Sequence, residues 1–147
     1  MARSERLRVF FDADVLIAGS ASRTGASHLL LRLAEVGLID SVTCAQAVRE
    51  VERNLAAKLP AAVPAFRAIL TAVDMKVVSD SPASRAELHL AQVHPDDRPI
   101  LMSALASKCD YLATFNVRHY RGLRGEIIVA RPGDILAQIR RRLVDLT

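Results

Sequence analysis

Short apolar runs alternate with amphipathic helical patterns along the chain, and this alternation constrains the fold more than any other feature of the sequence. Strands are predicted at 9–11, 38–43, 75–79, 111–115 and 126–130, and helices at 26–36, 45–59, 64–73, 81–92, 95–108 and 133–143. Such alternation favours a mainly parallel β-sheet with helices on both faces. We therefore expect an α/β fold that forms a single domain over residues 1–147.

The composition indicates a soluble, cytoplasmic protein. No apolar run approaches the ~20 residues that a membrane helix needs, and the N-terminus lacks the apolar core of a signal peptide. Cys44 and Cys109 lie far apart without the spacing of a zinc site. We expect both cysteines to be small core residues rather than parts of a disulfide framework.

Positive charge is concentrated near the C-terminus. The chain has 20 Lys and Arg against 16 Asp and Glu, which gives a formal net charge of +4. Seven arginines fall between residues 118 and 142, where only Glu126 and Asp134 oppose them. Arginine suits bidentate contacts with phosphate, so this segment is a candidate for binding nucleic acid. A solvated helix face explains residues 140–142 equally well.

Polar side chains stand where the apolar pattern ends. Asp12 and Asp14 directly follow the apolar run 9–11. A lone buried carboxylate is costly unless a cation, a hydrogen-bonding loop or a chemical role compensates for it. Sites in parallel sheets form outside the carboxyl ends of the strands, and both Asp12 and Asn116 follow predicted strands.

Most of the other acids have a structural explanation beside the functional one. Asp96 is a good N-cap, and Asp97 is a good first-turn acid for the helix that follows. Glu50 and Glu52 could pair with neighbouring arginines on a solvated face. A functional role is favoured for Asp12, because a turn at this position does not need an acid.

Three segments together resemble the PIN-domain family, the metal-dependent ribonuclease fold that includes VapC-type toxins of toxin–antitoxin pairs. They are the strand ending in FFDADVLIAG, EVERNL on a helix, and HPDDRPILMSALASKCDYLATFN. The resemblance covers about residues 8–129. It implies an Mg²⁺- or Mn²⁺-dependent endoribonuclease that hydrolyses RNA phosphodiester bonds. It also implies a cognate antitoxin protein and a second copy of the chain, in a homodimer, as partners.

The resemblance also implies the main residues of the site. The family's first three acids match Asp12, Glu50 and Asp97, and its fourth position, commonly Asp, is Asn116 here. An amide oxygen can ligate a metal but brings no charge, which lowers the expected affinity for a cation. The motif favours Glu50 as the second acid, whereas the helical wheel alone does not decide between Glu50 and Glu52.

Further side chains are expected to support this site. Four lie near the metal ligands: Thr114, Asp14, Asp96 and His119. Three arginines are expected to hold the RNA backbone: Arg118, Arg121 and Arg124. A divalent ion among carboxylates polarises the phosphate and activates a water, whose proton a carboxylate such as Asp97 can accept.

Two other functions fit part of the sequence. DADVL resembles the DxDx(T/V) signature of haloacid dehalogenase-like phosphatases, in which Asp12 would be the nucleophile and Asp14 a general acid. That alternative lacks a convincing later lysine and room for a cap domain. A PIN-like fold with an amide at Asn116 could also bind RNA or a protein without cutting. A metal-dependent RNA-cleavage assay on the wild type and Asp12→Ala separates the three functions.

Overall fold

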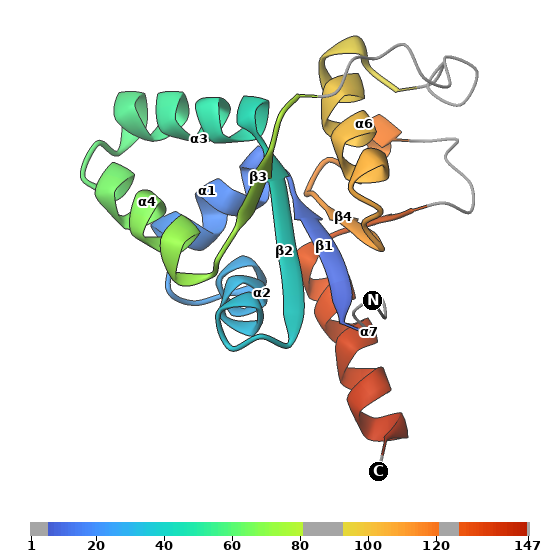
Figure 1. Ribbon diagram of the computed structural model, residues 1–147. Helices are drawn as coiled ribbons and strands as arrows, with labels where there is room; N and C mark the ends of the chain where they lie inside the picture. Colours follow the sequence, from blue (N-terminus) through green and yellow to red (C-terminus); the bar gives the residue numbers. More distant parts are fainter. Residues whose placement is uncertain (1–5, 81–92, 121–126, 147) are drawn as a thin grey trace.

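A parallel β-sheet forms the centre of the molecule. The computed structural model describes residues 6–80, 93–120 and 127–146. Its strands are β1 (Leu7–Phe11), β2 (Ile39–Cys44), β3 (Lys76–Val78), β4 (Tyr111–Ala113) and β5 (Ile128–Ala130). They form one five-stranded sheet in the order β3-β2-β1-β4-β5, and every neighbouring pair is parallel (Figure 1). The predicted α/β fold is confirmed.

Helices cover both faces of this sheet, as parallel strands require for their crossover connections. In the described residues these are α1 (Ala13–Ala21), α2 (Ala26–Glu35), α3 (Ala45–Lys58), α4 (Ala62–Ala72), α6 (Arg98–Ala106) and α7 (Pro132–Asp145), with the short 3₁₀ helices η1 (Pro95–Asp97) and η2 (Val117–Tyr120). Figure 1 shows α1, α3 and α4 on one side of the sheet and α6 on the other, and α7 packs against α2. No helix in the described ranges is long and apolar enough to cross a membrane.

The predicted elements match the observed ones apart from their ends and two larger differences. The predicted helix 95–108 is divided into η1 and α6, and α1 is not predicted at all. The sequence of α1, ADVLIAGSA, is almost uniformly apolar and therefore lacks the polar stripe by which a surface helix is recognised. The predicted helix 81–92 lies outside the described residues.

Helix α1 begins directly after β1 and packs closely against α2. A Cβ added to Gly19 would lie 2.5 Å from Cδ1 of Leu31, so a glycine lets α1 lie close against α2. Asp12 is the N-cap of α1, since its Oδ1 accepts a hydrogen bond from the backbone N–H of Ala13 at 2.7 Å. Asp12 therefore lies at the start of a helix whose residues Val15, Leu16 and Gly19 are buried in the core.

The core lies on both faces of the central strands. Val9, Phe10 and Phe11 of β1 are fully buried, which explains why this strand reads as a continuous apolar run. Each such side chain stabilises the fold by about 1.5–3 kcal/mol through burial. Cys44 and Cys109 are free and buried, so the prediction that both are core residues is confirmed.

The carboxyl ends of the strands meet at the upper edge of the sheet in Figure 1. The backbone N–H of Asp12 donates to the carbonyl of Ala113 at 3.0 Å, and that of Thr114 donates to the carbonyl of Ala130 at 3.0 Å. These bonds extend the ladder past the ends of β1 and β4. The starts of α1 and α3 and the loop after β4 therefore meet at one edge.

Candidate functional site

A pocket of about 580 Å³ opens at this edge. Four acids line it, namely Asp12, Asp14, Glu50 and Asp97, together with Asn116. They come from the end of β1, the first turn of α1, the face of α3, the start of α6 and the loop after β4. The fold thus brings together the four residues that the resemblance implied as metal ligands.

Asp12 is the most deeply buried of these acids, with 8% of its surface exposed. Its Oδ2 accepts hydrogen bonds from the hydroxyl of Thr114 at 2.9 Å and, more weakly, from that of Tyr120 at 3.4 Å. Burial, followed by the nearby charge of Asp14, raises the pKa of Asp12 to about 7, although hydrogen bonds from Ala13 N–H and Thr114 oppose the shift. The carboxyl group is therefore held where its charge is costly without a cation.

Asp14 ties the loop after β4 to α1. Its Oδ2 accepts from the Thr114 hydroxyl at 3.3 Å, the Phe115 backbone N–H at 2.9 Å and the Asn116 side-chain amide at 3.2 Å. Its Oδ1 is buried and accepts no hydrogen bond from any of the described residues. Burial is the main cause of the raised pKa of Asp14. One oxygen thus orders the loop while the other is a buried acceptor without a donor.

Asp97 is held by a histidine and not by the helix that it precedes. It occupies the N-cap position of α6, but its side chain makes no capping hydrogen bond. Its Oδ2 lies 3.0 Å from Nδ1 of His119 in η2. The capping interpretation of Asp96 is wrong, because the N-cap of η1 is His94, whose side chain accepts from the Asp96 backbone N–H.

The structure separates the two glutamates of α3. Glu50 lines the pocket and accepts a hydrogen bond from the side chain of Gln46 at 3.2 Å. Glu52 instead pairs with Arg67 of α4 at 3.1 Å, on the exposed surface. The geometry therefore agrees with the motif, which favoured Glu50.

Other candidates lie outside the pocket. Asp96 is exposed, and Oδ2 of its side chain lies 3.7 Å from Nδ1 of His94. Arg118 is exposed on η2 and does not line the pocket. Arg121 and Arg124 lie outside the described residues. The pocket instead contains three polar side chains of α3 that the sequence analysis did not select: Arg53, Asn54 and Lys58. Their spacing from Glu50 on one helix was the signal that could have identified them.

The donor set fits a divalent cation of the Mg²⁺ type, which prefers carboxylate and amide oxygens. The unpartnered Oδ1 of Asp14 and the raised pKa of Asp12 both mark a site that gains from added positive charge. Within the described ranges, no three His, Cys, Asp or Glu side chains are already clustered tightly enough to hold a metal ion.

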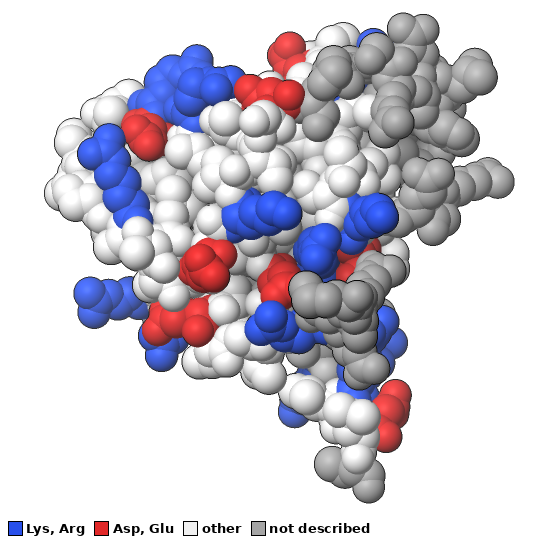
Figure 2. Space-filling model, viewed as in Figure 1, with Lys and Arg blue, Asp and Glu red and all other residues white. Residues whose placement is uncertain are grey.

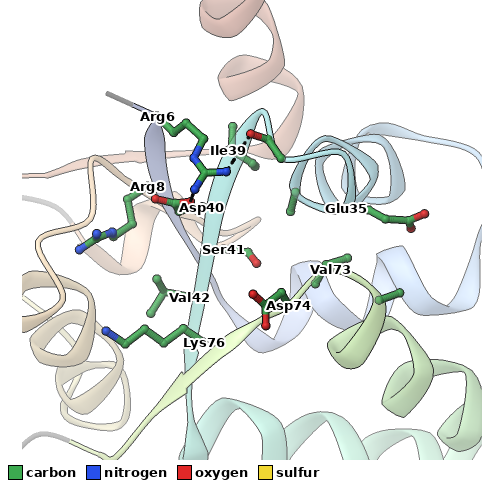
Figure 3. A pocket seen from close by; sticks show the side chains of 13 residues that line it. Arg6, Arg8, Glu35, Ile39, Asp40, Ser41, Val42, Val73, Asp74 and Lys76 are labelled. Atoms are coloured by element: carbon green, nitrogen blue, oxygen red, sulfur yellow. Dashed lines mark hydrogen bonds and ion pairs between the residues drawn. The ribbon is translucent and has the colours of Figure 1, made fainter. Parts of the chain in front are cut away.

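A second charged pocket, of about 390 Å³, lies at the amino ends of β1 and β2 (Figure 3). Its two arginines form ion pairs or hydrogen bonds with other groups of the protein. Arg6 pairs with Asp40 at 3.2 Å and donates to the carbonyl of Gly37 at 3.1 Å. The Arg8 guanidinium donates to the carbonyl of Ser107 at 2.8 Å. Three acids line this pocket as well, Glu35, Asp40 and Asp74, but they share it with three cations, Arg6, Arg8 and Lys76.

Comparisons with known proteins agree with this geometry. A family model described as PIN domain matches residues 8–118. Among solved structures, the fold is similar to a chain in the crystal structure of VapBC2 from Rickettsia felis bound to a DNA fragment from their promoter. The two chains share 12% sequence identity and superpose with a TM-score of 0.67, over 85% of this chain and 98% of that chain. No curated protein matches the sequence.

The chain belongs to the PIN-domain family, because the family model covers most of its length. Its fold is the VapC-type PIN fold that the resemblance implied. This assignment removes the support for the haloacid dehalogenase-like phosphatase.

Proposed function

We propose that this protein is a metal-dependent endoribonuclease that hydrolyses RNA phosphodiester bonds in the pocket at the carboxyl edge of the sheet. The observation that carries the proposal is the convergence there of Asp12, Glu50 and Asp97 from three distant parts of the chain. Membership of the PIN-domain family supports the same reaction class. Buried carboxylates without a cationic partner are expensive, and a function that uses their charge explains why they are present.

The residues that would hold the cation are Asp12, Glu50, Asp97 and Asn116, and the expected cation is Mg²⁺ or Mn²⁺. When bound, such an ion supplies positive charge against the scissile phosphate and lowers the pKa of a bound water. The Asn116 amide donates to Asp14, so its carbonyl oxygen is left available for a ligand role.

The chain's own residues orient these groups. The hydroxyl of Thr114 donates to both Asp12 and Asp14, which fixes the two carboxylates relative to each other. His119 holds one oxygen of Asp97 and leaves the other free to accept a proton from the attacking water. We therefore assign His119 and Thr114 as positioning residues.

We also propose a protein partner. The similar fold from Rickettsia felis belongs to a VapBC2 complex bound to promoter DNA. By analogy, this chain would be the toxin of a toxin–antitoxin pair, with an antitoxin as a separate chain. Formation of a homodimer remains a prediction.

Adjacent acids provide a sharp test of the proposed reaction. Asp97→Asn and Glu50→Gln should abolish Mn²⁺-dependent cleavage of RNA oligonucleotides, because both remove charge from the pocket. Asp96→Asn and Glu52→Gln are the matched controls, since these acids lie outside the pocket. Both controls should cleave within about twofold of the wild type, as expected of surface substitutions.

The same assay distinguishes the non-catalytic alternative. Equal cleavage by Asp97→Asn and Asp96→Asn would contradict the assignment of the site. RNA binding by the wild type with no cleavage under any divalent cation would favour a binding module, for which the amide at Asn116 is the motivating feature.

A further inference from the structure

One face of α3 lies along the floor of the acidic pocket. Glu50, Arg53, Asn54, Ala57 and Lys58 all line the pocket, and their spacing of three, four, seven and eight residues places them on one stripe of the helix. The buried residues of α3 lie on a neighbouring face that overlaps one edge of this stripe, and they anchor the helix in the core: Ala47, Val51 and Leu55. The stripe that lines the pocket is therefore held in a fixed orientation.

Among the described residues, the two cations on this stripe have no ionic partner, unlike other cations of α3 and α4. In the described part of the chain, Arg49 pairs with Asp80 at 2.7 Å and Arg67 pairs with Glu52 at 3.1 Å. No ion pair found among those residues includes Arg53 or Lys58. Both side chains are exposed, and Figure 2 shows Lys and Arg side chains gathered along the edge of the molecule that α3 forms.

A polyanion needs such cations beside this pocket. The four acids of the pocket carry a formal charge of −4 against +2 from Arg53 and Lys58, which leaves −2. That remainder equals the charge that one divalent cation neutralises. Without the two cations, a nucleic acid would approach a strongly repulsive site even with the metal bound.

We propose that Arg53 and Lys58 form a phosphate subsite that binds the RNA backbone next to the scissile bond. The inference rests on the proposed function, because it takes the acidic pocket as the place of cleavage. The two residues are five positions apart, which is about 7.5 Å along the helix axis and about 140° around it, so they lie on the two flanks of the stripe. This separation is on the scale of neighbouring phosphates in an extended strand, and the short side chain of Ala57 leaves space between them. The strand thus runs along α3, and the subsite is independent of base sequence.

Binding should be measured without cleavage, in the full chain carrying Asp12→Asn. The probes are two single-stranded RNA 12-mers of unrelated sequence, each with a fluorescent label. Adding Arg53→Gln and Lys58→Gln together should weaken binding to both probes by about tenfold and flatten the plot of log K against log salt by about 1.4, the effect of two lost phosphate contacts on a single strand.

The matched control removes the same charge outside both the pocket and the C-terminal arginine segment, with Arg32→Gln and Arg67→Gln. We expect less than a twofold change, because these arginines do not line the pocket. Equal losses in both pairs, or an unchanged salt slope for the α3 pair, would overturn the subsite. Thermal melts establish that each variant is folded.

Cleavage by proteins with Asp12 intact separates this inference from the proposed function. If the wild type cleaves RNA and the α3 pair cleaves with an unchanged KM, the subsite is wrong and the function stands. If the wild type never cleaves but the α3 pair alone loses binding, the nuclease proposal fails and the subsite stands. A raised KM with a nearly unchanged kcat supports both, since the contact lies away from the reacting atoms.

Discussion

The two edges of the parallel sheet both carry a charged pocket, yet they use their charges in opposite ways. At the amino edge, Arg6 pairs with Asp40, and Arg8 donates to a backbone carbonyl (Figure 3). At the carboxyl edge, Asp14 has a buried oxygen with no hydrogen-bond partner in the described part of the chain, and the pKa of Asp12 is raised to about 7. Partly exposed ion pairs cost little free energy and need no function to explain them. Buried carboxylates without a cationic partner are costly, and such groups are typical of binding or catalytic sites.

Buried hydroxyl groups show the reverse contrast, because the hydroxyl at the carboxyl edge is the bonded one. Thr114, at the carboxyl edge, is fully buried and donates to Asp12 and Asp14. Ser41, at the amino edge, is 5% exposed, and its Oγ has no hydrogen-bond partner. The Thr114 hydroxyl therefore contacts two carboxylates, whereas the Ser41 hydroxyl makes no hydrogen bond with the described residues.

The largest expected difference between the edges is in catalysis. Asp12→Asn should reduce Mn²⁺-dependent RNA cleavage at least about 100-fold, since losing a charged ligand should exceed the 10–100-fold typical of outer-shell changes. Asp40→Asn, which breaks a partly exposed ion pair with Arg6, should leave cleavage within about twofold. Initial rates on one RNA substrate test both. A comparable loss in Asp40→Asn would mean that the edges are not functionally distinct.

The second expected effect is a pH dependence of stability in the metal-free protein. Because the pKa of Asp12 is about 7 when folded and near 3.8 when unfolded, the folded state binds more protons between these values. The free energy of unfolding should therefore fall as the pH rises from about 4 to 7, by on the order of 4 kcal/mol.

Urea denaturation at several pH values in EDTA measures this change. Asp12→Asn should remove most of the fall, whereas Asp40→Asn should retain it. A free energy of unfolding that rises with pH across this window in the wild type would show that ionisation of Asp12 does not destabilise the folded protein.

The third effect compares the two hydroxyl groups. Thr114→Val should destabilise the protein by about 1–3 kcal/mol, because Oδ2 of Asp12 loses its shortest hydrogen bond and Oδ2 of Asp14 loses one of its three donors. Ser41→Ala should be nearly neutral, since its Oγ has no bond to lose. Chemical denaturation at fixed pH measures both free energies of unfolding. Equal destabilisation by the two substitutions would contradict the expected difference between the Thr114 and Ser41 hydroxyl groups.

The smallest expected effect is on metal affinity and concerns Asn116, at the carboxyl edge. Asn116→Asp adds a charge beside Asp14, whose oxygen now accepts from the Asn116 amide. The metal-free variant should be less stable, and Mn²⁺ should bind more tightly by about 1 kcal/mol for one added charge near a partly solvated ion. Calorimetric titration of both proteins with Mn²⁺ measures this. Equal or weaker affinity would mean that position 116 does not face the metal.

Much of the fold was predictable because it depends on local patterns. The strand–helix alternation predicted the parallel sheet, and Pro60 and Gly37 marked the ends of helices that the structure contains. The exception is α1, whose sequence is apolar on all sides because it is surrounded by other helices. A pattern that depends on contact with water could not reveal it.

The site was predictable in part, and the limits have a physical cause. The position of Asp12 after a buried strand marked it as a candidate functional residue from the sequence alone. Asp96 and Asp97 are neighbours in the 3₁₀ helix η1, where adjacent side chains differ by about 120° in direction, so only one of them can face the pocket. The structure resolves this ambiguity and places the cations of α3 beside the acids.

By itself, the sequence determined which segments become strands and helices and which acid would be costly to bury, because hydrophobic periodicity and desolvation act locally along the chain. Only the tertiary structure decided which side chains share one pocket, since Asp12, Glu50 and Asp97 meet through the packing of α1, α3 and α6 around the sheet. It also decided the pKa of Asp12, because burial and the distance to other charges are properties of the folded chain.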